Sequence, residues 1–164
     1  MTGVQTCALP ISSEADLAMV RGALDGTAPL EGLVVDQDQR WALLTSLVAA
    51  GAADTAEVEA ERERDNTSLG REKAARALAS APTSEAKEAA WKGAVEQGDL
   101  PNAVINAMAA GFGRARDPEV LRPFLPRYVT AIEDVWGSRT HAIAVGVGGE
   151  VERASCRERV CQYV

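Results

Sequence analysis

Histidine and cysteine are scarce in this chain, although these side chains most often bind catalytic zinc or act as nucleophiles. The 164 residues include one histidine, His141, and three cysteines, Cys7, Cys156 and Cys161, all near the two ends. A catalytic zinc site normally needs three protein ligands, and a catalytic triad needs a histidine partner. An odd number of cysteines near the chain ends fits neither a disulfide framework nor a zinc-binding pattern. We therefore expect no catalytic residue and no metal ligand in this chain, and interpret His141 as an ordinary surface or core histidine.

Several motifs of enzymes and of membrane proteins are also missing. The chain contains no glycine-rich phosphate loop, no G-x-S-x-G elbow and no dinucleotide-binding fingerprint. No apolar run reaches the roughly 18 residues that a membrane-spanning helix requires. Lysine and arginine number 17 against 24 acidic residues, for a formal net charge of −7. Because an acidic protein lacks a basic surface that neutralises phosphates, we expect neither nucleic acid nor an anionic membrane as a partner.

Small apolar residues are what the chain has in abundance. Apolar residues make up 46% of it, aromatic residues only 4%, and alanine is frequent. Alanine, glutamate and arginine favour helices, whereas strands favour β-branched and aromatic residues. Apolar residues recur at helical spacing and no strand-like alternation is present. The predicted fold is therefore all-α, in a chain long enough for one domain with a hydrophobic core.

Helix-capping signals divide the chain into about eight short helices. Asp54 and Glu57 have the spacing of a capping box, in which each side chain accepts a hydrogen bond from a backbone N–H group. Gly26 and Gly51 are positioned to end two helices. The predicted helices span 13–24, 36 or 38 to 50, 57–64, 66 or 67 to 79, 83 or 84 to 97, 101 onwards, 128–136 and 139–147.

Prolines punctuate the last third of the chain. Asp117 and Pro118 form a cap followed by proline at a first helical position, where the missing N–H costs nothing. Pro123 and Pro126 then interrupt the pattern before the helix at 128–136.

Short helices with short connections favour antiparallel helix pairs. Such pairs suit an irregular superhelix of the HEAT or armadillo kind. A strict repeat of fixed length is missing, so a consensus repeat array is not predicted.

Large aromatic and acidic side chains are further candidates for a site. Five aromatic residues could line a ligand groove, but core packing between the small alanine faces is the favoured interpretation. Glu61 and Glu63 could act as general acids or bases, yet they belong to an E-R-E-R-D run, for which a solvated helix face is expected. The aromatic residues are Trp41, Trp91, Phe112, Phe124 and Trp136.

The two ends of the chain differ in character from the interior. TGVQTCALPI at 2–11 and RASCRERV at 153–160 resemble in-frame translations of the adapters used in short-read sequencing libraries. Residues 1–11 also carry no lysine or arginine, so they do not match a signal peptide. We expect 1–11 and 152–164 to be adapter-derived, which would make 12–151 part of a domain of a longer protein.

The interior resembles a known family through the order of several segments. They are DQDQRWALLTSLVAAG (36–51), ERDNTSLGREKAARALASAPTSEAKEAAW (63–91), DLPNAVINAMAAGF (99–112) and LRPFLPRYVTAIEDVWGSR (121–139). In this order they resemble the C-terminal helical domain of bacterial, especially actinobacterial, zinc aminopeptidases of the aminopeptidase N type. The likeness covers nearly all of residues 12–147.

The resemblance implies a non-catalytic part of an enzyme that removes N-terminal residues from peptides. In this M1 family of zinc metallopeptidases, an earlier domain holds zinc through H-E-x-x-H and a distant glutamate, and binds the substrate's amino terminus through G-x-M-E-N. Neither motif occurs here, so no catalytic residue is carried over and the chain by itself should be inactive. The helical domain of the family encloses the active site. The implied partners are the missing catalytic domain and peptide substrates, with zinc in that domain and a cytoplasmic location.

Four arginines are chemically able to bind a peptide carboxylate: Arg40, Arg114, Arg116 and Arg127. Because most arginines are exposed or cap helices, we assign none of them to the substrate, and the substrate-binding residues stay unknown. An alternative interpretation is a stand-alone α-solenoid that binds another protein through its concave face and has no enzymatic activity.

Overall fold

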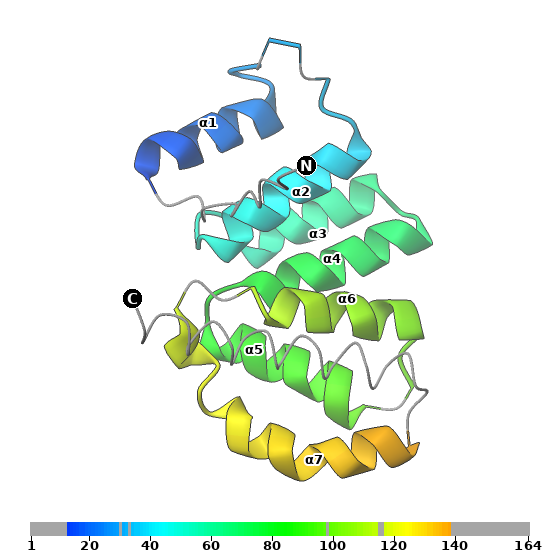
Figure 1. Cartoon of the computed structure of the whole chain (residues 1–164). Helices are drawn as coiled ribbons and strands as arrows, with labels where there is room; N and C mark the ends of the chain where they lie inside the picture. The colour runs from blue at the N-terminus through cyan, green and yellow to red at the C-terminus, as the bar shows by residue number, and fades with distance from the viewer. Residues whose placement is uncertain (1–12, 30, 33, 98, 115–116, 139–164) are drawn as a thin grey trace, which may run out of the picture.

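The structure, a computed structural model, describes residues 13–29, 31–32, 34–97, 99–114 and 117–138. Within these residues the chain forms helices and no strand (Figure 1). The helices are α1 (Glu14–Asp25), α2 (Gln37–Ala49), α3 (Thr55–Arg64), α4 (Ser68–Ser80), α5 (Ser84–Trp91), the π-helical η1 (Lys92–Glu96), α6 (Asn102–Phe112), the 3-10 turn η2 (Pro118–Val120) and α7 (Phe124–Ser138). The all-α prediction is confirmed, and the helix predicted at 139–147 lies outside the described residues.

Capping signals place the helix ends much as the sequence predicts. Asp54 accepts a hydrogen bond from the Glu57 N–H at 3.0 Å, and Glu57 accepts one from the Asp54 N–H at 3.3 Å, which completes the capping box of α3. A second box, formed by Asp36 and Gln39, begins α2. Gly26 ends α1 with a φ of 74°, a left-handed conformation that glycine adopts without steric cost.

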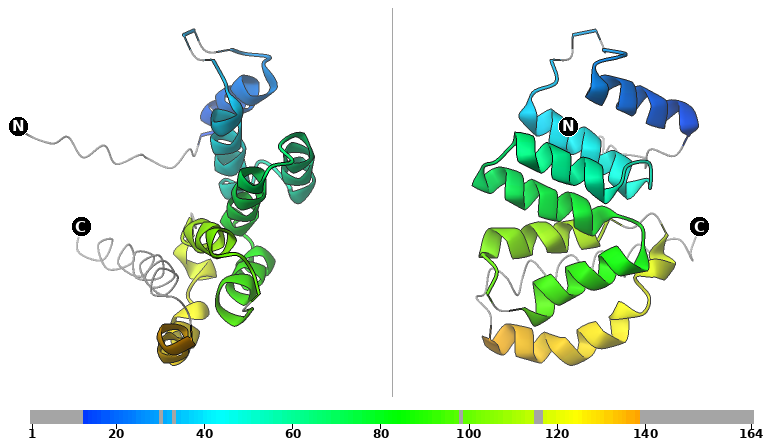
Figure 2. Two further views of the ribbon diagram at one scale, coloured as in Figure 1. Left: turned by 90° about the vertical axis from the view of Figure 1, so that its right-hand side faces the viewer. Right: turned by 180° about the vertical axis from the view of Figure 1, so that it is seen from behind.

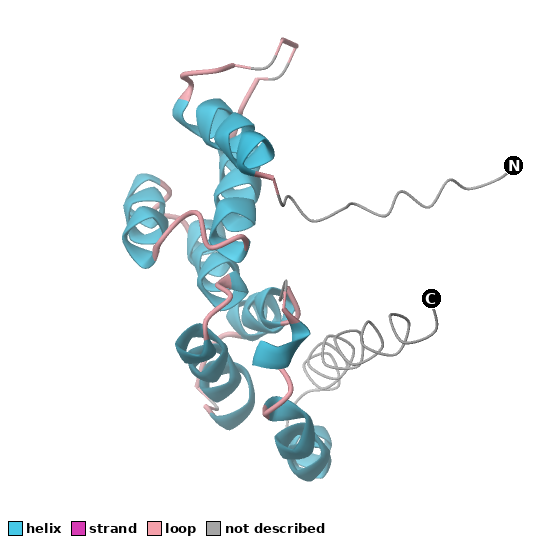
Figure 3. Ribbon diagram, turned by 90° about the vertical axis from the view of Figure 1, so that its left-hand side faces the viewer, coloured by secondary structure: helices cyan, strands magenta, loops and turns pink. Residues whose placement is uncertain are grey.

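The helices stack along one direction, from α1 at one end to α7 at the other (Figure 1). Figures 2 and 3 view this stack from its two sides. Both show α3 displaced to one side of α2 and α4, and α5 displaced to the same side of α6. Such an offset is typical of stacked helix pairs. The superhelical path of the stack stays a prediction.

Helix α4 is the central element, because it packs against α2, α3, α5 and α6. Small residues allow this close packing. A Cβ atom added to Gly111 of α6 would lie 2.3 Å from the carbonyl oxygen of Arg76 in α4, so the two helix backbones nearly touch there. Ala74 and Ala77, on the other side of α4, are 2% and 0% exposed.

Apolar side chains form a core on each side of α4. The first core cluster joins α1, α2, α3 and α4 and includes Trp41 and Leu47. A second cluster contains Trp91, Phe112 and Phe124, whose ring centroids lie 5.1 to 6.1 Å apart. The structure describes the side chains of four of the five predicted aromatic core residues, and all four are buried. The side chain of the fifth, Trp136, lies outside the described residues.

The proline-containing segment differs from its prediction. Asp117 and Pro118 begin the 3-10 turn η2 and not an α-helix. The Asp117 carboxylate accepts a hydrogen bond from the Glu119 N–H at 2.9 Å. Helix α7 begins at Phe124, four residues earlier than predicted. Pro126 fits within its first turn, because backbone N–H groups there have no helical acceptor to lose.

The helix predicted at 83 or 84 to 97 also differs, because its α-helical part ends at Trp91 and continues as η1. In η1, a Cβ atom added to Gly93 would lie 2.4 Å from Cε of Met108 in α6. Packing against α6 is a property of the tertiary structure, so helical periodicity does not report it.

Candidate functional site

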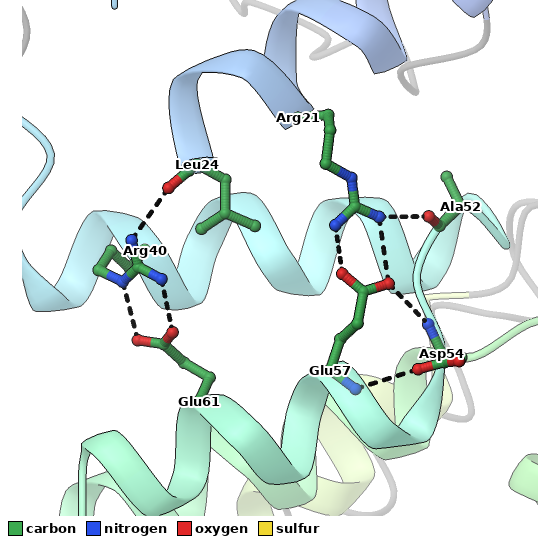
Figure 4. Close-up of polar contacts among 7 residues, drawn as sticks. All are labelled: Arg21, Leu24, Arg40, Ala52, Asp54, Glu57 and Glu61. Carbon is green, nitrogen blue, oxygen red and sulfur yellow. Dashed lines mark hydrogen bonds and ion pairs between the residues drawn. The ribbon is translucent and has the colours of Figure 1, made fainter. Parts of the chain in front are cut away.

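An arginine–glutamate pair joins α2 to α3 beneath the end of α1 (Figure 4). Arg40 donates from Nε to Oε1 of Glu61 at 2.9 Å and from Nη2 to Oε2 of Glu61 at 2.7 Å. Its third nitrogen, Nη1, donates to the carbonyl oxygen of Leu24 at 2.9 Å. This carbonyl lies in the last turn of α1, where helical carbonyls lack intrahelical partners. Arg40 therefore binds α1 and α3 at once.

A second pair lies one helical turn earlier on α3 (Figure 4). Arg21 of α1 donates to both carboxylate oxygens of Glu57 and, from Nη2, to the carbonyl oxygen of Ala52 at 2.6 Å. We call the four side chains Arg21, Arg40, Glu57 and Glu61 the α1 clasp. The clasp connects α1 to α2, to α3 and to the loop between them.

Glu61 corrects the expectation that the E-R-E-R-D run forms a solvated face. Its side chain is only 5% exposed, and Gln37 also donates to it at 2.8 Å. The hydrogen bonds from Arg40 hold the pKa of Glu61 below its usual value, although burial opposes this effect. Glu63, two residues later, is exposed as expected. The missed signal is that Glu61 follows the buried Val58 by three residues, on the same helix face.

A buried tryptophan–aspartate contact closes the junction of α3 and α4. The indole Nε1 of Trp41 donates to Oδ2 of Asp65 at 2.8 Å, and the Thr67 hydroxyl donates to Oδ1 at 2.7 Å. These two donors, Thr67 first, lower the pKa of Asp65. The backbone fits tightly here, since a Cβ atom on Gly70 would lie 2.0 Å from the Asp65 carbonyl oxygen.

Lys87 of α5 is a fully buried lysine, at 0% exposure. Its Nζ donates to the carbonyl oxygen of Ala79 at 2.7 Å and to that of Gly111 at 3.4 Å, and lies 5.8 Å from the centre of the Phe112 ring. Both carbonyls belong to the last turns of helices, α4 and α6, where the helix dipoles are negative. Burial lowers the pKa of Lys87 to about 8. The missed signal is that Lys87 precedes Ala90 by three residues and Trp91 by four, which places it on the same apolar helix face.

Arg127 of α7 binds two glutamates on one side and two aromatic rings on the other. Its guanidinium donates to Glu88 at 2.6 and 3.0 Å and to Glu96 at 3.0 Å. The guanidinium carbon lies 5.1 Å from the ring centres of both Trp91 and Phe124. Arg127 thereby lowers the pKa of Glu88 and fixes α7 against α5 and η1.

Of the four candidate arginines, the structure describes three. Arg40 and Arg127 bind glutamates of this chain, Arg114 is exposed just after α6, and Arg116 lies outside the described residues, as does His141. Among the residues the structure describes, no group of three or more His, Cys, Asp and Glu side chains could hold a metal ion. The same part of the chain has no helix long and apolar enough to cross a membrane.

Comparison with known proteins identifies the family. The family model described as "ERAP1-like C-terminal domain" matches residues 6–158, which is most of the chain. The chain belongs to the ERAP1-like C-terminal domain family. It is also 44% identical, over 128 residues, to Aminopeptidase N of Streptomyces lividans. That alignment covers 78% of this chain and 15% of the relative, so this ERAP1-like domain corresponds to a small part of the relative's length. The resemblance found in the sequence is confirmed.

Proposed function

We propose that this ERAP1-like domain is the non-catalytic helical part of a zinc-dependent aminopeptidase of the M1 type, and that it helps to enclose the peptide and the active site. Residues 12–151 would form this part, with 1–11 and 152–164 derived from adapters. The catalytic domain of the same polypeptide and peptides would be its partners, and the cytoplasm its location. The observation that carries the proposal is the 44% identity to Aminopeptidase N over 128 residues.

The geometry agrees with a scaffold more than with a reaction centre. The charged groups of the clasp, Lys87 and Arg127 all bind groups of this chain, across helices. Such contacts hold helices in register. The described residues also offer no ligand set for zinc, so we derive no step through the metal on this chain.

A chimera tests the proposal directly. Residues 13–138 would replace the aligned segment in Aminopeptidase N of Streptomyces lividans, and release of 4-nitroaniline from aminoacyl 4-nitroanilides would be measured. We expect the chimera to retain hydrolysis that a chelator removes and zinc restores. The same enzyme with the segment deleted is the control, and we expect it to lose activity. A folded chimera as inactive as the deletion would contradict the proposal and favour the stand-alone interaction module.

The isolated 164-residue chain provides the complementary test. We expect it to release no product from the same substrates, with or without added zinc. Zinc-dependent turnover by this chain would show that the catalytic residues lie within it, against the assignment of the chemistry to another domain.

A further inference from the structure

Helix α1 lies at one end of the described stack (Figure 1). Its main packing partner among the described helices is α2, whereas α4 packs against four helices. Only Val20, Gly22, Ala23 and Leu24 of its twelve residues are buried, and Met19 on its outer face is 48% exposed. Residues 26–36 connect it to α2. Apolar burial therefore attaches α1 mainly through its second half, with Leu17 of the first half packed against the same core cluster.

The α1 clasp supplies the remaining attachment, and it does so through charge. Arg21 belongs to α1, so its bonds to Glu57 and to the Ala52 carbonyl break together when α1 moves away. Arg40 belongs to α2 and would lose only its bond to the Leu24 carbonyl, while keeping Glu61. Other charges lie close enough to interact with the clasp. Asp25 and Asp54 lie near Arg21, Asp25 lies near Arg40, and Arg64 lies 4.0 Å from Glu61.

We propose that α1 undocks from the helical stack as a unit, and that the α1 clasp sets how often it does so. Local openings of this kind occur where few apolar contacts hold an element, at a lower free energy than global unfolding. The stack from α2 to α7 stays folded in the open form, because both core clusters retain α4 at their centre. This conformational device does not depend on the proposed aminopeptidase function.

Hydrogen exchange of backbone amides in the full chain, followed by mass spectrometry, tests the proposal. Glu61→Gln and Glu57→Gln each remove one carboxylate charge of the clasp while preserving the side-chain shape. We expect the amides of α1 to exchange about tenfold faster or more in Glu57→Gln, and to a smaller extent faster in Glu61→Gln, which acts on α1 only through Arg40. The amides of α4 and α6 should change much less. Glu63→Gln, an exposed glutamate of the same helix, is the matched control, and we expect no change in α1.

Arg21→Gln covers the case in which Glu61→Gln unfolds the chain, because Arg21 is less buried than Glu61. Its α1 amides should also exchange faster while α4 keeps its protection. Raising the salt concentration of the wild-type chain from about 0.05 to about 1 M should act in the same direction, since the Arg21 pair is partly exposed and screened. Exchange in α1 that is unchanged in the variants, or that always rises in step with α4, would overturn the proposal.

Discussion

Two charged side chains of this protein, Glu61 and Lys87, occupy buried helix positions where apolar residues are usual. Lys87 replaces an apolar residue in the stripe of α5, and Glu61 does so in the stripe of α3. Each position is tolerated because the tertiary structure supplies partners: two helix-terminal carbonyls for the ammonium, and Arg40 with Gln37 for the carboxylate. Removing the partners of either group would leave an uncompensated buried charge, which is strongly destabilising.

The buried ammonium of Lys87 makes stability depend on pH in the alkaline range. The pKa is about 8 in the folded chain and 10.5 for an ordinary lysine, so between these values the unfolded chain binds a proton that the folded chain does not. The free energy of unfolding should therefore rise with pH in this window, relative to a Lys87→Met variant, by up to about 1.4 kcal/mol per pH unit. Urea denaturation of both proteins from pH 7.5 to 10.5 measures the difference.

Lys92→Met is the control for this experiment, because it changes a lysine in the neighbouring turn that is exposed. Its stability relative to the wild type should vary much less with pH. A constant difference between wild type and Lys87→Met across the window would show that the buried lysine keeps its ordinary pKa.

At the scale of helices, close backbone contact decides how the elements assemble. The contact of Gly111 with the Arg76 carbonyl allows α6 to lie directly against α4, and it also brings the Gly111 carbonyl to Lys87. A larger residue at this position would separate the helices and weaken both features. The glycine is therefore required by packing and not by an unusual φ angle, since it lies within a helix.

Gly111→Ala should consequently destabilise the chain, although alanine is the better helix former by about 1 kcal/mol. An added Cβ atom 2.3 Å from a backbone oxygen forces the helices apart, and overpacking of this kind costs about 1–3 kcal/mol. Asn106→Ala, at an exposed position of the same helix, is the control and should be neutral or slightly stabilising. Thermal denaturation followed by circular dichroism compares them. A Gly111→Ala variant more stable than wild type would disprove the close contact.

At the scale of the whole molecule, α4 couples the two sides of the stack. Leu47, 0% exposed, lies in the first core cluster, and Ile105, 1% exposed, lies between α6 and η1 on the other side. Because α4 packs against the helices of both residues, damage to either side should reach it. The chain would then unfold around α4 as one cooperative unit, with α1 as the element that can open separately.

Leu47→Ala and Ile105→Ala test this coupling. Each should lower the free energy of opening of the α4 amides by about 2–5 kcal/mol, the usual cost of such a truncation. Hydrogen exchange measures that free energy amide by amide, with exposed Leu69→Ala as the control. Protection of α4 that falls in one variant and not in the other would show two separately folding halves.

Local chemistry along the chain was enough to predict most of the described α-helices. Capping boxes, C-terminal glycines and helical periodicity act within a few residues, so Asp54 with Glu57 and Gly26 could be read directly. The burial of Trp41, Trp91, Phe112 and Phe124 followed equally from their size and apolar character. The order of segments along the chain was also enough to place it in its family.

Tertiary structure decided the roles of the charged residues and the irregular helix ends. Whether Glu61 faces water or Arg40 depends on where α2 lies, which is a contact over 21 residues of sequence. Lys87 is buried because the ends of α4 and α6 converge on it, and η1 forms where the chain packs against α6. The sequence by itself therefore determined which segments are helical, because helix formation depends on neighbouring residues. Packing between distant helices determined which charges are buried, because only their convergence supplies the partners that a buried charge requires.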